Sequence, residues 1–406
     1  MLPEAATQTL SLCARIASLT DVPSTITRPF LSPATAQVHT LLREEMHSLG
    51  MSVRTDSIGN LRGTLPGTNP HHTLLLGSHI DTVPNAGPYD GILGVALPLA
   101  LLHTLKAPFR FNIELIAFSE EEGIRFKLPF IGSRALTGTL MQQDLARQDP
   151  AGTTIQQACT NFGLPPYDPQ DCALTPGTFA FLECHIEQGP VLESLGLPLG
   201  IVSTIAGQSR FLITFTGQAN HAGTTPMHLR KDALAAAAQF ITTVETLARG
   251  RDSLVATVGI IHAQPGAANI IPGTATLTLD VRHPQDFSRA AAVHLLTQAA
   301  QTIATNRGLT VEITPTSEQS SVPMHPSLRE ALKNAAPPGT PEIPSGAGHD
   351  AMILAPQIPS AMLFLRTPAG LSHHPEESVS ASDIEAALET LHNFLHHMNP
   401  QVFVIP

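Results

Sequence analysis

The sequence has little of what marks a nucleic-acid-binding, secreted or membrane-spanning protein. Its 22 Lys and Arg are outnumbered by 33 Asp and Glu, and the formal net charge of −11 argues against binding to phosphate-rich surfaces. The four cysteines are widely spaced and include no C-x-x-C pair, which indicates reduced thiols in a reducing compartment. No run of about 18 uncharged apolar residues occurs, so we expect no spanning helix.

We also expect no secretory leader in the first 19 residues. They contain Glu4 and Arg15 and have no basic segment followed by an unbroken apolar stretch, so they predict an ordinary amphipathic helix. We therefore expect a cytoplasmic protein. With 406 residues, 42% of them apolar, the chain is long enough for two or three domains with a sizeable core. Its 19 histidines are too many to be all catalytic or metal-binding, so their positions in the sequence must indicate which of them are.

Two rhythms alternate along the chain. Residues 73–118 follow a strand, helix, strand order, which is typical of a mainly parallel α/β sheet. Residues 207–320 follow the order β-α-β-β-α-β, which is typical of a ferredoxin-like sandwich. An α/β rhythm then returns, with a final helix at 382–397 for which Ser382 and Asp383 would serve as the N-cap.

The most economical organisation is a catalytic domain made of two chain segments with a smaller domain inserted between them. We place the catalytic segments at residues 1–206 and 321–406, and the inserted domain at residues 207–320. The fold class is thus α/β with an inserted β-α-β-β-α-β domain.

The strongest local motif is GSHIDTVPNAGPYDGILGV, residues 77–95. His79 leaves a buried strand, Asp81 follows two residues later, and Asp90 ends a Gly- and Pro-rich loop just before a helix. Strand ends of open α/β sheets carry functional loops, and an imidazole with carboxylates suits a divalent metal. Asp81 could orient the His79 ring. The alternative is a polar turn with a capping aspartate.

A second motif, SEEEGIRF at residues 119–126, ends the next apolar strand. Three adjacent carboxylates leaving a core strand are costly unless a cation or proton compensates them. A metal could hold one carboxylate while its neighbour serves as a general base. The alternative is a solvated acidic turn.

Two further segments carry histidines near strand ends. In FLECHIEQGPVLE, residues 181–193, alternation puts His185 and Glu187 on one face and Gln188 on the other, if the strand extends that far. In LSHHPEESV, residues 371–379, either His373 or His374 could be a ligand and the other a surface residue. Taken alone, His185 would be a structural histidine.

These four segments occur in one order together with four others. GSHIDTVPNAGPYDG, SEEEGIRF, HIEQGPVLE, GQANHAGTTPMHLRKDA, ANIIPG, TLDVRH, SGAGHDAM and LSHHPEESV closely resemble the M20-type amidases of the hydantoinase/carbamoylase group. The resemblance extends from about Ile26 to the final helix. It implies a di-metal aminopeptidase-like catalytic domain, and it implies that the inserted ferredoxin-like domain is a lid through which two subunits form a homodimer.

The resemblance also implies two divalent metal ions per subunit, with Zn²⁺ as the first choice and Mn²⁺ or Co²⁺ as alternatives. His79 and His185 would hold the first ion and Glu122 and His373 the second, with Asp90 bridging them.

Further roles follow from the same resemblance. Glu121 would be the general base, and Asp81 the carboxylate behind the ligands. His221 would help to stabilise the oxyanion, often from the partner subunit. Substrate contacts would come from the remaining matched positions, Gln188, Asn269, Arg282 and Gly348.

We therefore expect a hydrolase that cleaves a ureido or carbamoyl C–N bond of a small anionic substrate. Ala86 and the stretch TIAGQSR favour allantoate; N-carbamoyl-L-amino acids come second, with β-ureidopropionate and ureidoglycolate as related options. An M20 exopeptidase and a non-catalytic metal-binding paralogue remain as alternatives. A serine hydrolase is excluded because no G-x-S-x-G occurs.

Overall fold

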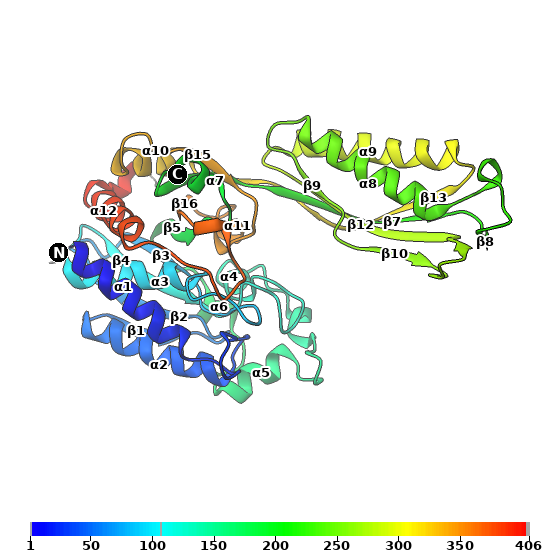
Figure 1. Cartoon of the computed structure of the whole chain (residues 1–406). Coiled ribbons are helices and arrows are strands. Elements are labelled where there is room, and N and C mark those ends of the chain that lie inside the picture. Colours follow the sequence, from blue (N-terminus) through cyan, green and yellow to red (C-terminus); the bar gives the residue numbers. More distant parts are fainter. Residues whose placement is uncertain (1, 106–107, 403–406) are drawn as a thin grey trace. The chain divides into compact units, whose positions relative to one another are not determined.

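The computed structural model describes residues 2–105 and 108–402 (Figure 1). The described chain forms two compact units. The first comprises residues up to Ser203, Met324–Ile343 and the residues from Ala347 on; the second comprises Thr204–Pro323 and Pro344–Gly346.

A mixed sheet is the framework of the first unit. Its strands lie in the order β1 (Ser52–Thr55), β2 (Leu61–Leu65), β4 (Asn112–Phe118), β3 (Thr73–His79), β5 (Thr178–Ile186), β16 (Ser360–Leu365), β6 (Leu199–Ile205) and β14 (Val322–Pro323), and β15 (Glu342–Ser345) also pairs with β6. The four central strands β4, β3, β5 and β16 are parallel to one another, as the sequence predicts. The outer pairs β1–β2, β2–β4 and β6–β16 are antiparallel.

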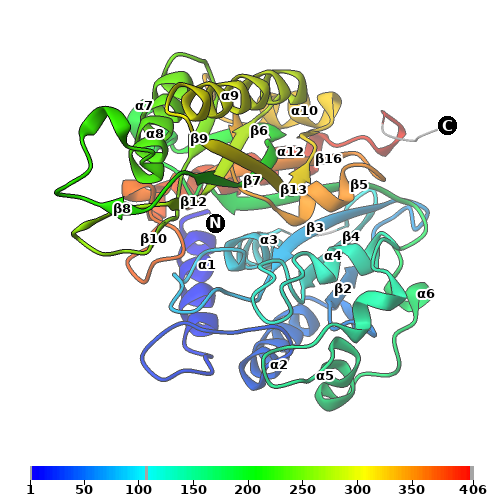
Figure 2. The same cartoon turned by 90° about the vertical axis from the view of Figure 1, so that its right-hand side faces the viewer.

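Both faces of the central strands are buried, which explains why β3 is a continuous apolar run rather than an alternating one. Residues such as Leu74 and Leu182 face a core shared with α1 (Leu2–Ala17), α3 (Ile92–Thr104) and α12 (Ala381–His397). α1 lies alongside α3 (Figures 1 and 2). The short helix α11 (Asp350–Leu354) packs against β5 and β16.

The remaining helices of this unit are short or peripheral. They are α2 (Pro33–Ser48), α4 (Ile131–Leu136), α5 (Ile155–Phe162), α6 (Pro169–Cys172), α7 (Val191–Leu195) and α10 (Pro326–Ala335). The N-cap expected for α12 is wrong by two residues. Ser380 caps this helix, because its side chain accepts the hydrogen bond of the Asp383 N–H.

The second unit is a sheet with two helices. Its elements are β7 (Gly207–Thr216), α8 (Ala233–Arg249), β9 (Val255–Thr257), β10 (Ile261–Gln264), β12 (Thr274–His283), α9 (Asp286–Asn306) and β13 (Thr310–Gln319). The strand order is β10-β12-β7-β13, with β9 also paired to β12. The helices α8 and α9 lie along one face of this sheet (Figure 1). Odd-numbered residues of β7 and β12, including Phe215 and Leu277, form a core with them. Even-numbered residues therefore lie on the face away from the helices.

The short strands β8 (Asn220–His221) and β11 (Ile270–Ile271) form a separate antiparallel pair within this unit. The strands through which the chain enters and leaves the unit are themselves paired, since Val322 of β14 lies opposite Ile205 of β6.

Two expectations about what the chain lacks can be compared with the structure. No helix among the described residues has the length and apolar character needed to cross a membrane. All four cysteines are free and buried, as expected.

Candidate metal centre

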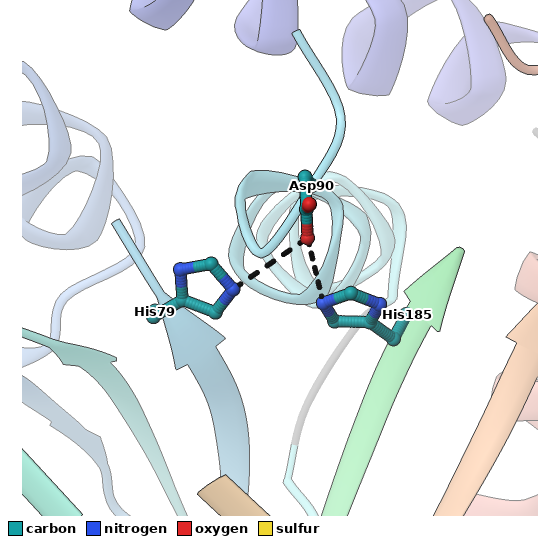
Figure 3. A group of neighbouring side chains, drawn as sticks. All are labelled: His79, Asp90 and His185. Atoms are coloured by element: carbon teal, nitrogen blue, oxygen red, sulfur yellow. Dashed lines mark ion pairs between the residues drawn. The ribbon is translucent and has the colours of Figure 1, made fainter. Parts of the chain in front are cut away.

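Three side chains converge where β3 and β5 end (Figure 3). His79 is the last residue of β3, His185 is the next-to-last residue of β5, and Asp90 closes the loop that leads into α3. Gly91 follows Asp90 with φ +69°, and a Cβ at this position would overlap the His79 ring. A glycine is therefore required for Asp90 to approach the histidines.

The rings present their Nε2 atoms to one carboxylate oxygen. Nε2 of His79 and of His185 lie 3.7 and 3.2 Å from Asp90 Oδ1 (Figure 3). Each Nδ1 lies beside a main-chain carbonyl, at 3.0 Å from Asp81 O for His79 and 2.9 Å from Ile186 O for His185. If Nδ1 carries the hydrogen, each Nε2 has a lone pair on the side of the carboxylate. The Nε2 of His185 also accepts the Gly91 N–H at 3.2 Å.

This arrangement needs a positive charge in its centre. Asp90 Oδ1 is buried and accepts no hydrogen bond from the described residues. The donor atoms of His79, Asp90 and His185 all lie within 4.8 Å of one another. Two neutral imidazoles and a carboxylate at this separation are a suitable donor set for a divalent metal.

The other oxygen of Asp90 belongs to a second group of donors. His373 Nε2 lies 3.1 Å from Asp90 Oδ2 and 3.3 Å from Glu122 Oε1. Hydrogen bonds with the Asp90 and Glu122 carboxylates raise the pKa of His373 to about 10. The neighbouring His374 is exposed and accepts a hydrogen bond from the Glu376 N–H instead. Asp90 thus stands between two donor groups, one on each oxygen.

Glu121 lies beside these groups, since a carboxylate oxygen of Glu121 comes within 4.8 Å of donor atoms of His79 and Glu122. Burial, joined by the charges of Glu122 and Asp350, raises the pKa of Glu121 well above its usual value although His79 opposes the shift. For Asp90, burial acts in the same direction but the three histidines outweigh it and hold its pKa well below the usual range. Neighbouring carboxyl groups with such opposite tendencies suit different roles.

Asp81 connects the two loops that carry these residues. Its carboxylate oxygens accept the N–H groups of Glu121 at 2.9 Å and Glu122 at 3.2 Å, and one of them lies 3.3 Å from His79 Nδ1. It therefore fixes both the ring of one donor and the backbone of the SEEEG turn.

The end of β5 differs from one sequence expectation. The strand stops at Ile186, so Glu187 does not continue the alternation. Its carboxylate instead accepts the N–H groups of Val191 and Leu192 at the start of α7. Gln188 has φ +58° and donates from Nε2 to Asp90 Oδ2 at 3.0 Å, next to Ser372, whose hydroxyl donates to the same oxygen.

Several buried groups around the centre were missed by the sequence reasoning. Glu377 accepts the N–H groups of Tyr89 and Asp90 on one carboxylate oxygen and so holds the loop of the central aspartate. Glu183 and His349 lie close to His185, since ligand atoms of the three side chains lie within 4.8 Å of one another. Glu377 stands in the quoted motif LSHHPEESV and His349 in SGAGHDAM, so the signal was present, but one sequence does not show which motif residue is structural.

Gly348 lies beside the aromatic ring of Phe130, and a Cβ at Gly348 would come within 2.9 Å of that ring. This position therefore favours a residue without a side chain.

The three remaining expected residues lie in the second unit and are not all together. His221 lies on β8 opposite Ile270, and the Ala222 N–H donates to Asn269 O. Arg282 lies at the far end of β12, opposite Gln208. Eight residues of extended strand separate Arg282 from Thr274, which is about 26 Å at the usual rise per residue. The structure brings His221 and Asn269 together beside the β8–β11 pair and places Arg282 near the end of β12 that lies away from Thr274.

The fold and these donors define an α/β protein with buried histidines and carboxylates gathered at strand ends, as in a metallohydrolase. Residues 75–397 match the peptidase family M20/M25/M40. The chain is 38% identical to an N-carbamoyl-L-amino acid amidohydrolase of Geobacillus stearothermophilus, over 91% of this chain and 92% of that protein. It is 36% identical to an allantoate deiminase of Arabidopsis thaliana, over 94% of this chain and 80% of the relative.

A solved structure agrees with these sequence matches. A hydantoinase/carbamoylase family amidase from Burkholderia ambifaria has a TM-score of 0.90 and 32% identity, covering 96% of both chains. The chain belongs to peptidase family M20/M25/M40, and its similarity is to the hydantoinase/carbamoylase amidases.

Proposed function

We propose that this protein hydrolyses a ureido or carbamoyl C–N bond in a small anionic substrate, with allantoate as the first candidate. The observation that carries the proposal is Asp90, whose two oxygens serve two separate donor groups while the Glu121 carboxylate lies beside both. Relatives named for allantoate and for N-carbamoyl-L-amino acids match nearly the whole chain, and the second name makes N-carbamoyl-L-amino acids the alternative substrate.

The proposed site takes two divalent metal ions. His79 and His185 would hold one, Glu122 and His373 the other, and Asp90 would bridge them. Ions bound there supply Lewis acidity toward the substrate carbonyl and the attacking water. Zn²⁺ is our first choice because two of the ligands to the first ion are imidazoles, and Mn²⁺ or Co²⁺ would accept the same donors.

Glu121 is proposed to move the proton. Its raised pKa suits a group that takes a proton from water and then delivers it to the leaving nitrogen. Asp81 would hold the Glu121 backbone and the His79 ring in place during this transfer. Gln188 and Gly348 would contact the substrate near the centre.

The second unit is proposed to be a ferredoxin-like lid and the dimerisation domain. Its strand order and its β-α-β-β-α-β succession support this assignment. A small substrate cannot reach both ends of its sheet. We therefore propose that Arg282 binds the substrate carboxylate in one subunit, whereas His221 and Asn269 act on the substrate of the partner subunit.

The test is ammonia release by metal-reconstituted protein on allantoate and on N-carbamoyl-L-amino acids, with a chelated sample as control. We expect metal-dependent activity on allantoate exceeding that on the carbamoyl amino acids by at least tenfold. A reversed preference would move the substrate to N-carbamoyl-L-amino acids and keep the mechanism. Activity on dipeptides alone would indicate an exopeptidase, and tight metal binding without turnover would indicate a metal-binding paralogue.

A further inference from the structure

Arg282 does not stand alone on the sheet of the second unit. Asp280 accepts its Nε at 3.0 Å and its Nη2 at 3.1 Å, one on each carboxylate oxygen. Nη1 donates to Gly346 O. These bonds use three of the five N–H groups of the guanidinium. One N–H on each terminal nitrogen is left without a partner among the described residues, which is the number that a carboxylate can accept.

A paired arginine is a poor anion site by itself, because a guanidinium and a carboxylate in contact have no net charge. Asp280 is ionised here: burial would raise its pKa, but Arg282 and Arg210 outweigh burial and lower it. If Arg282 and Asp280 were the only charges, a substrate carboxylate would meet a neutral pair and would also be repelled by Asp280.

Arg210 changes this balance. It lies directly opposite Asp280 on the neighbouring strand β7, and its Nε donates to Asp280 Oδ2 at 2.8 Å. Gln208, opposite Arg282, donates to the same oxygen at 2.8 Å. The two guanidiniums and one carboxylate therefore carry a net charge of +1. All four residues are even-numbered and lie on the face of the sheet away from the helices.

The free donors of Arg210 support a role beyond the sheet. Its side chain is 49% exposed, and the N–H groups of both terminal nitrogens have no partner among the described residues. Arg210 is not needed to join the two strands, because the Gln208 side chain already connects β7 to the Asp280 carboxylate.

We propose that Arg210 is a specificity-determining residue, which with Asp280 and Arg282 forms a carboxylate-binding site of net charge +1 on the sheet of the second unit. This rests on the proposed function, in which Arg282 binds the substrate carboxylate. Asp280 is a positioning residue that holds both guanidiniums. The site takes one carboxylate from a small ureido or carbamoyl substrate and discriminates against the corresponding uncharged amide.

The experiment measures binding without turnover, by calorimetry on the metal-loaded Glu121→Gln protein with N-carbamoylglycine and with N-carbamoylglycinamide as probes. Adding Arg210→Gln should weaken the binding of N-carbamoylglycine about tenfold and change the binding of N-carbamoylglycinamide by no more than twofold. Arg210→Lys should recover part of the lost affinity. The affinity for N-carbamoylglycine should also fall less steeply with salt concentration in Arg210→Gln than in the parent protein. Arg249→Gln, which removes an exposed charge on α8 of the same unit, is the matched control and should change nothing.

Three results would overturn the inference: no difference between Arg210→Gln and Arg249→Gln, equal weakening of the acid and the amide, or no binding of the acid to the parent protein. In otherwise native protein, Arg210→Gln should raise KM for the carboxylate substrate about tenfold with kcat within twofold. The proposed function is judged separately, by whether the native protein releases ammonia from ureido or carbamoyl substrates at all.

Discussion

At the scale of the residue, the candidate centre depends on how Asp90 is shared. One oxygen faces His79 and His185 and the other faces His373, so each donor group is incomplete without this side chain. Glu121, which we propose transfers the proton, lies next to the metal donors. Asp81 accepts a hydrogen bond from the backbone N–H of Glu121 and does not hold its side chain. Binding of the metal and movement of the proton should therefore be separable by substitution.

Glu121→Gln is expected to remove activity while leaving the metal content unchanged, because the amide keeps the shape but cannot accept the proton. General acid–base groups contribute about 10²- to 10⁴-fold to rate, so kcat should fall by that amount. Steady-state kinetics and metal analysis of the same sample would check this. Full activity in this variant would sink the assignment of the base.

Gly91→Ala should disturb the centre through both its backbone and its new methyl group. The positive φ costs about 1–2 kcal/mol for a residue with a Cβ, and the Cβ would displace the His79 ring. Gly138 has a similar φ of +67°, and a Cβ there would have no other atom within 4 Å, so Gly138→Ala carries the backbone cost alone. We expect only Gly91→Ala to bind less metal in equilibrium dialysis; equal metal binding by both variants would contradict the contact.

Much of this centre could be predicted because its donors stand at strand ends within recognisable motifs. His79 and His185 follow buried strands, and the loop before α3 supplies Asp90. The sequence could not reveal that Glu187 caps α7 or that Glu377 holds the Asp90 backbone, because both depend on where a strand stops and on contacts between distant segments. The sequence alone does not distinguish a metal-binding carboxylate from a structural one, because the difference lies in which N–H groups donate to it in the fold.

At the scale of the element, the helices show how local polar groups stabilise or limit the fold. The sequence rhythm predicts α12, but the N-cap lies two positions before the expected one. Ser380 and Ser382 are both acceptable caps, and the structure uses Ser380. In α2, His39 is buried with its ring edge-on to Phe162, and its Nε2 has no hydrogen-bond partner among the described residues. A buried neutral histidine of this kind makes stability depend on pH.

Burial, with a smaller contribution from Arg43, lowers the pKa of His39 to about 4. Below its ordinary value of 6.5 the unfolded chain takes up a proton that the folded chain refuses, so stability falls as pH decreases from 6.5 toward 4. The loss should reach about 3 kcal/mol. His39→Leu should lose this component, which denaturant titrations of both proteins at pH 7 and pH 5 would show; parallel losses would contradict it.

At the scale of the whole molecule, the order of the segments was predictable and the separation of the expected substrate contacts was less so. Element rhythm predicts a domain at residues 207–320 inserted into another, and the second compact unit of the structure comprises Thr204–Pro323 and Pro344–Gly346. Asn269 and Arg282 are only 13 residues apart in the sequence, but Asn269 lies before β12 and Arg282 near the far end of this strand. That separation is the reason for our proposal that two subunits complete each site.

Mixed dimers test this arrangement. If His221 serves the partner's centre, a dimer of one Glu121→Gln chain and one His221→Ala chain has one intact site and one doubly defective site. Refolding equal amounts of the two inactive variants together should restore about a quarter of wild-type activity, since half of the dimers are mixed. Activity no greater than the sum of the separate variants would show that His221 acts within its own subunit.

The pairing of β6 with β14, the strands through which the chain enters and leaves the second unit, has a consequence for protein engineering. Because Val322 lies opposite Ile205, and the Met324 N–H donates to Ser203 O at 3.0 Å, the points of departure and return are neighbours across a ladder. A two-residue turn could join them, closing the remaining chain without stretching it. The inserted segment could therefore be deleted or replaced by another domain, and the sheet that carries the histidines would keep its strand order.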